Sequence, residues 1–182
     1  MMNSILTKHI GVVAIGSGLI GASIYWLMIT VTLAHIEALS GQVPFDMRPF
    51  GYGVSEAATL LESLGEDGRA YYVSHQIVLD TLYPAMLALT LIATIRWFGR
   101  RRTNSKLARS GIALSVGSAL FDYAENFGIA AMIWNWPEIS APMVYATSLA
   151  TVLKSILTTL AVLLTLLMGV SWTCLWREDV RA

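Results

Sequence analysis

Four ionisable residues interrupt otherwise apolar stretches of the sequence: Asp80, Asp122, Glu125 and Lys154. A charge at the centre of a bilayer costs at least about 2.5–3.5 kcal/mol, so such residues usually face a bundle interior and mark ligand sites or proton relays. Counted from the expected outer ends of their helices, all four lie roughly 13–18 Å deep. We therefore expect them to form one charge cluster inside the membrane.

The polar residues around this cluster follow helical spacing. Steps of three and four residues place one set on a single helix face: Ser115, Ser118, Asp122, Glu125 and Asn126. The same steps give a second set: Thr147, Thr151, Lys154, Ser155 and Thr158. Such stripes must turn inward, because lipid cannot satisfy their hydrogen bonds.

A third face carries Gln76, Asp80, Tyr83 and Pro84. Proline removes the hydrogen bond to the carbonyl four residues earlier, which here belongs to Asp80. The sequence therefore predicts a free backbone acceptor beside the Asp80 carboxyl. We expect a site that binds a small or lipid-like ligand, or relays protons. Its expected residues are Asp80, Tyr83, Asp122, Glu125, Asn126 and Lys154, with Tyr52, Arg69 and His75 at the outer mouth.

Two other interpretations stay open. The charges could form a structural network that fixes helix register, in an accessory subunit of a larger membrane complex or in a homo-oligomer. Alternatively, Asp122 or Glu125 could donate a proton and Asp80 accept one, in an acid–base enzyme acting on a lipid or isoprenoid. No motif names a reaction, so an enzyme is the less favoured interpretation and the catalytic residues stay unassigned.

The histidines give only a weak signal for a cofactor. His35 and His75 are expected near the outer surface at similar depth, where they could hold haem or a metal ion. Neither lies in an HxxxH or HExxH pattern. We therefore predict no metal and no cofactor.

Composition fixes the class of protein. The 182 residues are 55% hydrophobic and 13% charged, whereas soluble domains carry roughly 25% charged residues. Twelve basic and twelve acidic residues give a net charge of zero, so the composition does not indicate a positively charged surface for nucleic acid. The single cysteine, Cys174, excludes an internal disulfide framework. These features indicate an all-α integral membrane protein whose main partner is the lipid bilayer.

Four stretches are long and apolar enough to cross a bilayer, at residues 10–34, 71–95, 110–134 and 143–172. They predict one transmembrane domain over residues 1–182, folded as a four-helix bundle. Residues 35–70 form an outer cap loop in this interpretation. A short amphipathic helix within it would begin at a Ser55 cap and stop at Gly65.

Basic residues set the expected orientation. Residues 96–109 contain half of all the basic residues and no acid: Arg96, Arg100, Arg101, Arg102, Lys106 and Arg109. Residues 35–70 are acidic. The positive-inside rule therefore places residues 96–109 and both termini in the cytoplasm, and residues 35–70 outside. We expect a multi-pass protein of a bacterial inner membrane.

Five short motifs follow one another along the chain: Phe50-Gly51-Tyr52, Leu64-Gly65 with Gly68-Arg69, Leu79-Asp80 with Tyr83-Pro84, Phe121-Asp122-Tyr123 with Glu125-Asn126, and Leu153-Lys154-Ser155. In this order they resemble an uncharacterised family of small bacterial four-span membrane proteins. The resemblance covers most of the chain, from the outer loop to the fourth helix. It implies the four-span fold and brings no activity with it.

Overall fold

The computed structural model describes residues 9–99 and 105–181, with side chains for residues 9–99 and 106–171. Its described part is helical and contains no strand. The elements are α2 (Ile10–Leu27), a π-helical turn η1 (Met28–Thr32), α3 (Leu33–Ser40), a 3-10 turn η2 (Phe45–Met47), α4 (Val54–Tyr71), a π-helical turn η3 (Tyr72–Gln76), α5 (Ile77–Phe98), α6 (Ser105–Trp134) and α7 (Ala141–Arg181). The expected all-α class is confirmed.

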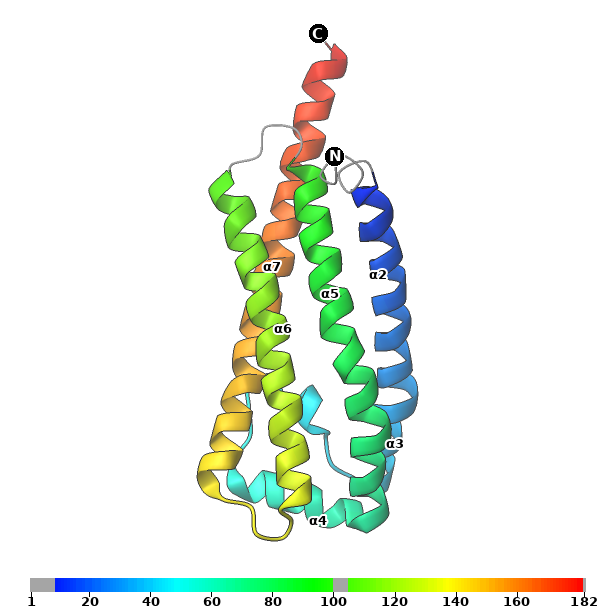
Figure 1. Cartoon of the computed structure of the whole chain (residues 1–182), viewed down its shortest axis with the longest axis vertical. Coiled ribbons are helices and arrows are strands. Elements are labelled where there is room, and N and C mark those ends of the chain that lie inside the picture. The colour runs from blue at the N-terminus through cyan, green and yellow to red at the C-terminus, as the bar shows by residue number, and fades with distance from the viewer. Residues whose placement is uncertain (1–8, 100–104, 182) are drawn as a thin grey trace, which may run out of the picture.

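The long helices lie side by side (Figure 1). α2 packs on α5, α5 on α6 and α6 on α7. α4 lies across one end, where it contacts α3 and α7, whereas the start of α2 and the end of α7 lie at the other end. α2 and α5 are in direct contact at Gly21, where an added Cβ would lie 3.4 Å from the Met86 side chain, an ordinary van der Waals distance.

Three helical segments in the described part are long and apolar enough to cross a membrane: Ile10–Ser40, Val54–Phe98 and Ala141–Ser171. Large apolar side chains such as Leu19, Phe127 and Leu167 are 66%, 73% and 67% exposed. Apolar surface on this scale suits contact with lipid. α6 is equally long, but Asp122, Glu125 and its serines make it more polar than these three segments.

The first and second helices end at other residues than the sequence predicted. The first continues through η1 and α3 to Ser40, beyond residue 34, and ends at Gly41. Gly41 has the left-handed backbone that commonly ends a helix (φ 64°), and its N–H donates to the Glu37 carbonyl over 2.8 Å. The second helix runs on to Phe98. The segment between α3 and α4 is residues 41–53, which contain η2, so α3 and α4 take up the rest of the expected 35–70 cap.

The helix in the cap starts earlier than the expected Ser55. Its N-cap is Gly53, whose N–H donates to the Glu56 carboxylate over 2.7 Å. This contact satisfies the N–H of the N-cap residue, and no side chain of the N-cap accepts from the first turn. Gly65 interrupts α4 with φ 63°, and the chain then turns helical again and leads into η3. The expected end at Gly65 is thus a break between two helical pieces.

The basic loop expected at 96–109 is described only in part. Arg96 belongs to α5, while Lys106 and Arg109 belong to α6. Arg100, Arg101 and Arg102 lie outside the described residues, as does the side chain of Cys174.

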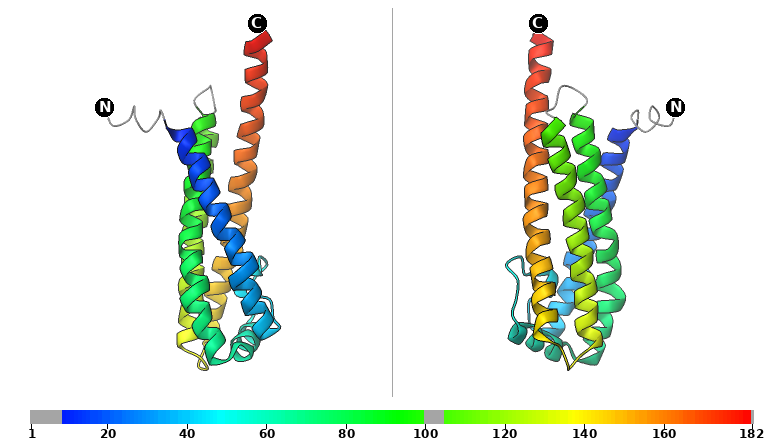
Figure 2. Two further views of the ribbon diagram at one scale, coloured as in Figure 1. Left: turned by 90° about the vertical axis from the view of Figure 1, so that its right-hand side faces the viewer. Right: turned by 60° about the vertical axis from the view of Figure 1, so that its left-hand side comes forward.

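Residues 41–53 fold back alongside the long helices instead of staying at their ends (Figures 1 and 2). Phe45 is fully buried, and its N–H donates to the Tyr72 hydroxyl over 3.1 Å. The Tyr52 N–H donates to Ser148 Oγ of α7 over 2.8 Å. Gly51 has φ 84°, and a Cβ there would lie 2.6 Å from Ser148 Oγ, so this close approach requires glycine. The loop is an integral part of the core.

Candidate functional site

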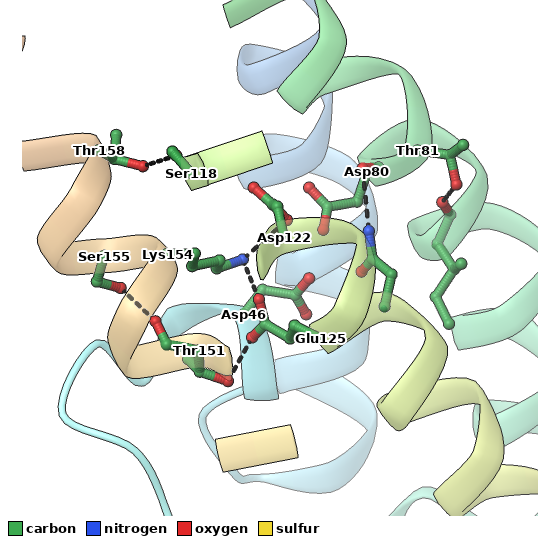
Figure 3. A network of polar contacts seen from close by, with 12 residues as sticks. Asp46, Asp80, Thr81, Ser118, Asp122, Glu125, Thr151, Lys154, Ser155 and Thr158 are labelled. Atoms are coloured by element: carbon green, nitrogen blue, oxygen red, sulfur yellow. Dashed lines mark hydrogen bonds and ion pairs between the residues drawn. The ribbon is translucent and has the colours of Figure 1, made fainter. Parts of the chain in front are cut away.

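Lys154 joins the polar stripes of α6 and α7. Its Nζ lies 3.2 Å from Asp122 Oδ1 and also contacts Glu125 Oε2 (Figure 3). Glu125 is fully buried, and its other oxygen accepts a hydrogen bond from Thr151 Oγ1 over 2.7 Å. The structure therefore brings together three residues that the helical spacing predicted to meet, and one ammonium serves two carboxylates.

Asp80 lies beside this group without an ion pair of its own. Its side chain belongs to a residue only 2% exposed, and Oδ2 has no hydrogen-bond partner among the described residues. Its strongest charged neighbours are two other acids, Asp122 and Asp46. The backbone carbonyl of Asp80 does have a partner, because Asn126 Nδ2 donates a hydrogen bond to it over 3.0 Å. This is the acceptor that Pro84 leaves free.

Asp46 is a member of the site that sequence analysis missed. It belongs to η2, and its carboxylate accepts hydrogen bonds from the Tyr72 hydroxyl and from Gln76 Nε2, the latter over 3.2 Å. Gln76 in turn accepts a hydrogen bond from Thr32 of η1. Figure 3 shows Asp46 next to Asp122, Glu125 and Lys154. The returning loop thus adds a fourth carboxyl to the cluster.

A cavity of about 400 Å³ borders the cluster. Its polar wall includes Asp46, Asp80, Tyr83, Asp122, Lys154, Ser155 and Thr158. Its apolar wall comes largely from the first helix, through Tyr25, Met28, Ile29 and Leu33. The cavity therefore lies between the first helix and α7.

The helix arrangement leaves this side of the molecule open. The packing order places α5 and α6 between α2 and α7. Figure 2 shows α2 and α7 diverging toward the end where α7 terminates, with the returning loop beside them near the other end. The cavity lies between these two helices, and Met47 and Pro49 of the returning loop also line it. A ligand with both a polar and an apolar part would match its two walls.

Tyr52, Arg69 and His75, which were expected together at the outer mouth, lie at different places in the structure. Tyr52 is buried, and its ring packs on Phe45 with centroids 4.7 Å apart. Burial raises the pKa of the Tyr52 hydroxyl above its ordinary value, and the nearby Glu125 carboxylate adds to this. Tyr52 therefore lies next to the cluster and holds the loop against it, although it does not line the cavity.

Arg69 and His75 lie away from the cavity. Arg69 Nη1 donates to the Leu61 carbonyl over 2.7 Å, and its guanidinium lies over the Trp136 ring, 5.7 Å from the centroid. Arg69 thus ties α4 to the turn before α7. His75 is exposed and stacks on Tyr71, with centroids 4.3 Å apart, and Tyr71 also contacts the His35 ring at 4.4 Å.

The described residues contain no group of three or more His, Cys, Asp or Glu side chains arranged to hold a metal ion. His35 and His75 both pack against Tyr71, as aromatic contacts at the helix ends. Their position gives no support to the haem or metal interpretation.

Comparisons with protein-family models, with curated proteins and with solved structures found no match to this chain. The functional argument therefore rests on the site itself.

Proposed function

We propose that this chain is a multi-pass protein of a bacterial inner membrane with four spans, formed by α2–η1–α3, η3–α5, α6 and α7. Both termini would be cytoplasmic, and α4 would cover the outer face. The excess of basic residues between α5 and α6 supports this orientation. The buried polar side chains of α6, which include Asp122 and Glu125, support its inclusion as a span.

We further propose that the protein binds an amphiphilic, lipid-like ligand. The observation that carries this proposal is the cavity of about 400 Å³, lined by buried carboxyls and by apolar side chains of the first helix. Ligand pockets commonly measure about 300–1,000 Å³ and combine an apolar lining with a few polar groups. The ligand would enter from the bilayer, with its head group at Asp80 and its chain along Met28 and Ile29.

Ligand binding accounts for the site better than the alternatives do. A purely structural network would be expected to satisfy every buried carboxyl, whereas Asp80 lines the cavity and its buried Oδ2 has no hydrogen-bond partner among the described residues. A proton relay would need titratable groups leading toward the cytoplasmic end. On that side of the cluster, Thr90 donates to Ser17 over 2.9 Å, and neither hydroxyl titrates near neutral pH.

Native mass spectrometry of the purified protein tests this proposal with three probes that share one chain length: dodecanol, dodecylamine and dodecanoic acid. We expect at least one probe to bind with one molecule per protein. Ser155→Trp fills the cavity from α7 and should remove this binding. Ile156→Trp adds the same ring to the neighbouring residue, which is 50% exposed, and should leave binding intact.

Ile29→Trp fills the same cavity from η1 and gives a second test should Ser155→Trp fail to fold. Binding that survives a folded cavity-filling variant would contradict the proposal. So would failure of all three probes to bind the wild-type protein.

A further inference from the structure

The charges that line the cavity are unbalanced. Its walls carry three carboxyls, from Asp46, Asp80 and Asp122, and among the described lining residues the basic side chain is Lys154. Lys154 is already shared between Asp122 and the buried Glu125. The cavity therefore offers a surplus of acidic groups, and its one ammonium is offset by carboxylates on two sides.

Within this surplus, Asp80 is the carboxyl among the described lining residues with an oxygen left unpartnered, while its side chain also hydrogen-bonds the Asp122 carboxyl. Asp46 accepts two hydrogen bonds, from Tyr72 and Gln76, and Asp122 accepts one from Lys154. Asp80 Oδ2 has no partner among the described residues although the residue is only 2% exposed. An unpaired buried carboxylate is costly, and a cation beside it offsets that cost. A bound cation would supply the partner that Asp80 Oδ2 lacks in the described part of the chain and would favour the ionised carboxylate.

Two aromatic rings line the same cavity. Tyr25 of α2 and Tyr83 of α5 both line it, with ring centroids 5.4 Å apart. The face of a tyrosine ring attracts an ammonium group, and this attraction grows when water is excluded. The two rings would favour a cation over an anion of the same size.

We infer that the cavity selects amphiphiles with a cationic amine head group, and that the Asp80 carboxylate contacts the charge. The head group lies between Asp80 and the rings of Tyr25 and Tyr83, while its hydrocarbon chain follows Met28 and Ile29 toward the bilayer. This inference rests on the proposed function and names the class of ligand for the same site.

The test compares dissociation constants for dodecylamine, dodecanol and dodecanoic acid at pH 7, measured with wild-type protein by native mass spectrometry. The probes differ only in the head group. We expect dodecylamine to bind about tenfold or more tightly than dodecanol, because hydrogen bonds to charged groups are the stronger class. Dodecanoic acid should bind most weakly.

Asp80→Asn should bring dodecylamine and dodecanol to within about threefold of each other, with dodecanol still binding. Asp80→Glu retains the charge and should retain the preference. Asp67→Asn removes an exposed acid of α4 and should change nothing. Ser155→Trp should remove the binding of both probes.

The two proposals fail in different ways. Wild-type protein that binds dodecanol as tightly as dodecylamine, or that prefers dodecanoic acid, overturns the cationic ligand and leaves amphiphile binding in place. An amine preference unchanged in folded Asp80→Asn overturns the role of Asp80. Wild-type protein that binds none of the probes overturns both proposals. The wild-type ranking decides the ligand class even where a variant does not fold.

Discussion

The side-chain amide of Asn126 donates a hydrogen bond to the backbone carbonyl of Asp80 across 3.0 Å. Pro84 has no N–H, so α5 cannot supply the helical donor for this carbonyl. α6 therefore satisfies a backbone group of α5 at a residue that lines the cavity. The bond fixes the position of Asp80 relative to Asp122, one helical turn from Asn126.

Asn126→Ala should lower the free energy of unfolding by about 1–3 kcal/mol, because it leaves the buried Asp80 carbonyl without a donor. The measurement is equilibrium unfolding in mixed micelles. Asn135→Ala is the matched control, since Asn135 is exposed, follows the end of α6 and donates to the Ala131 carbonyl over 2.8 Å. A loss as large in Asn135→Ala as in Asn126→Ala would contradict the assignment.

A double-mutant cycle with Pro84→Ala tests the physical reason for that bond. Alanine restores an N–H that can donate to the Asp80 carbonyl within α5. Asn126→Ala should therefore cost less stability in the Pro84→Ala background than in the wild type. An equal cost in the two backgrounds would show that Asn126 does not substitute for the missing helical donor.

Lys154→Met should be strongly destabilising, by about 3–5 kcal/mol, since it leaves two buried carboxylates without a counter-ion. Replacing all three charges at once, in Lys154→Met with Asp122→Asn and Glu125→Gln, should recover most of this loss. The free energies of unfolding of the single and triple variants give the comparison. A triple variant no more stable than Lys154→Met would mean that unpaired charge is not the cause.

Gly128 permits the close packing of α6 and α7 that brings Glu125 to Lys154. A Cβ at Gly128 would lie 2.1 Å from Thr147 Oγ1, whereas a Cβ at Gly16 would meet nothing within 4 Å. Gly128→Ala should therefore cost about 1–3 kcal/mol through overpacking. Gly16→Ala should be neutral or stabilising by up to about 1 kcal/mol. Thermal unfolding of the two variants would reveal a reversed order if this reasoning were wrong.

Tyr72 holds the returning loop through one hydroxyl, which donates to Asp46 and accepts from the Phe45 N–H at 3.1 Å. Tyr72→Phe should raise amide hydrogen exchange at Phe45 by about tenfold or more, because a buried donor loses its acceptor. Tyr71→Phe is the neighbouring control and should leave exchange at Phe45 unchanged. Identical exchange in Tyr72→Phe and the wild type would contradict this role.

Tyr52 should make stability fall at alkaline pH. Burial raises the pKa of its hydroxyl in the folded state, whereas a tyrosine hydroxyl in the unfolded chain ionises near pH 10. The unfolded state therefore loses its proton first, and the stability present below pH 10 declines by up to about 1.4 kcal/mol per pH unit above it. Tyr52→Phe should flatten the stability profile above pH 10. Parallel profiles would rule out this contribution.

Local pattern was sufficient to predict the pairing of α6 with α7. Helical spacing alone grouped Asp122 and Glu125 on one face and Thr151 and Lys154 on another, and a polar stripe can be satisfied only by a second stripe. The contacts of Lys154 with both acids follow from that rule. The free backbone carbonyl of Asp80 could also be predicted from local sequence, because it depends only on the position of Pro84.

The position of Asp46 could not be predicted from spacing. Its partners Tyr72 and Gln76 lie 26 and 30 residues further along the chain, and it belongs to a loop without helical periodicity. A pocket beside the charge cluster was expected, but its apolar wall was not, since Met28 and Ile29 of η1 carry no polar signal in the sequence. Such features depend on how separate helices meet in space.

The most direct test of the central claim is a crystal structure of the protein grown with 12-bromododecylamine in a lipid phase. Bromine scatters anomalously, so its position in the bound molecule can be located. The account predicts a bromine peak along the apolar wall near Met28 and Ile29, with the amine beside the Asp80 carboxylate. Bromine peaks confined to the outward helix faces, with water in the cavity, would contradict it.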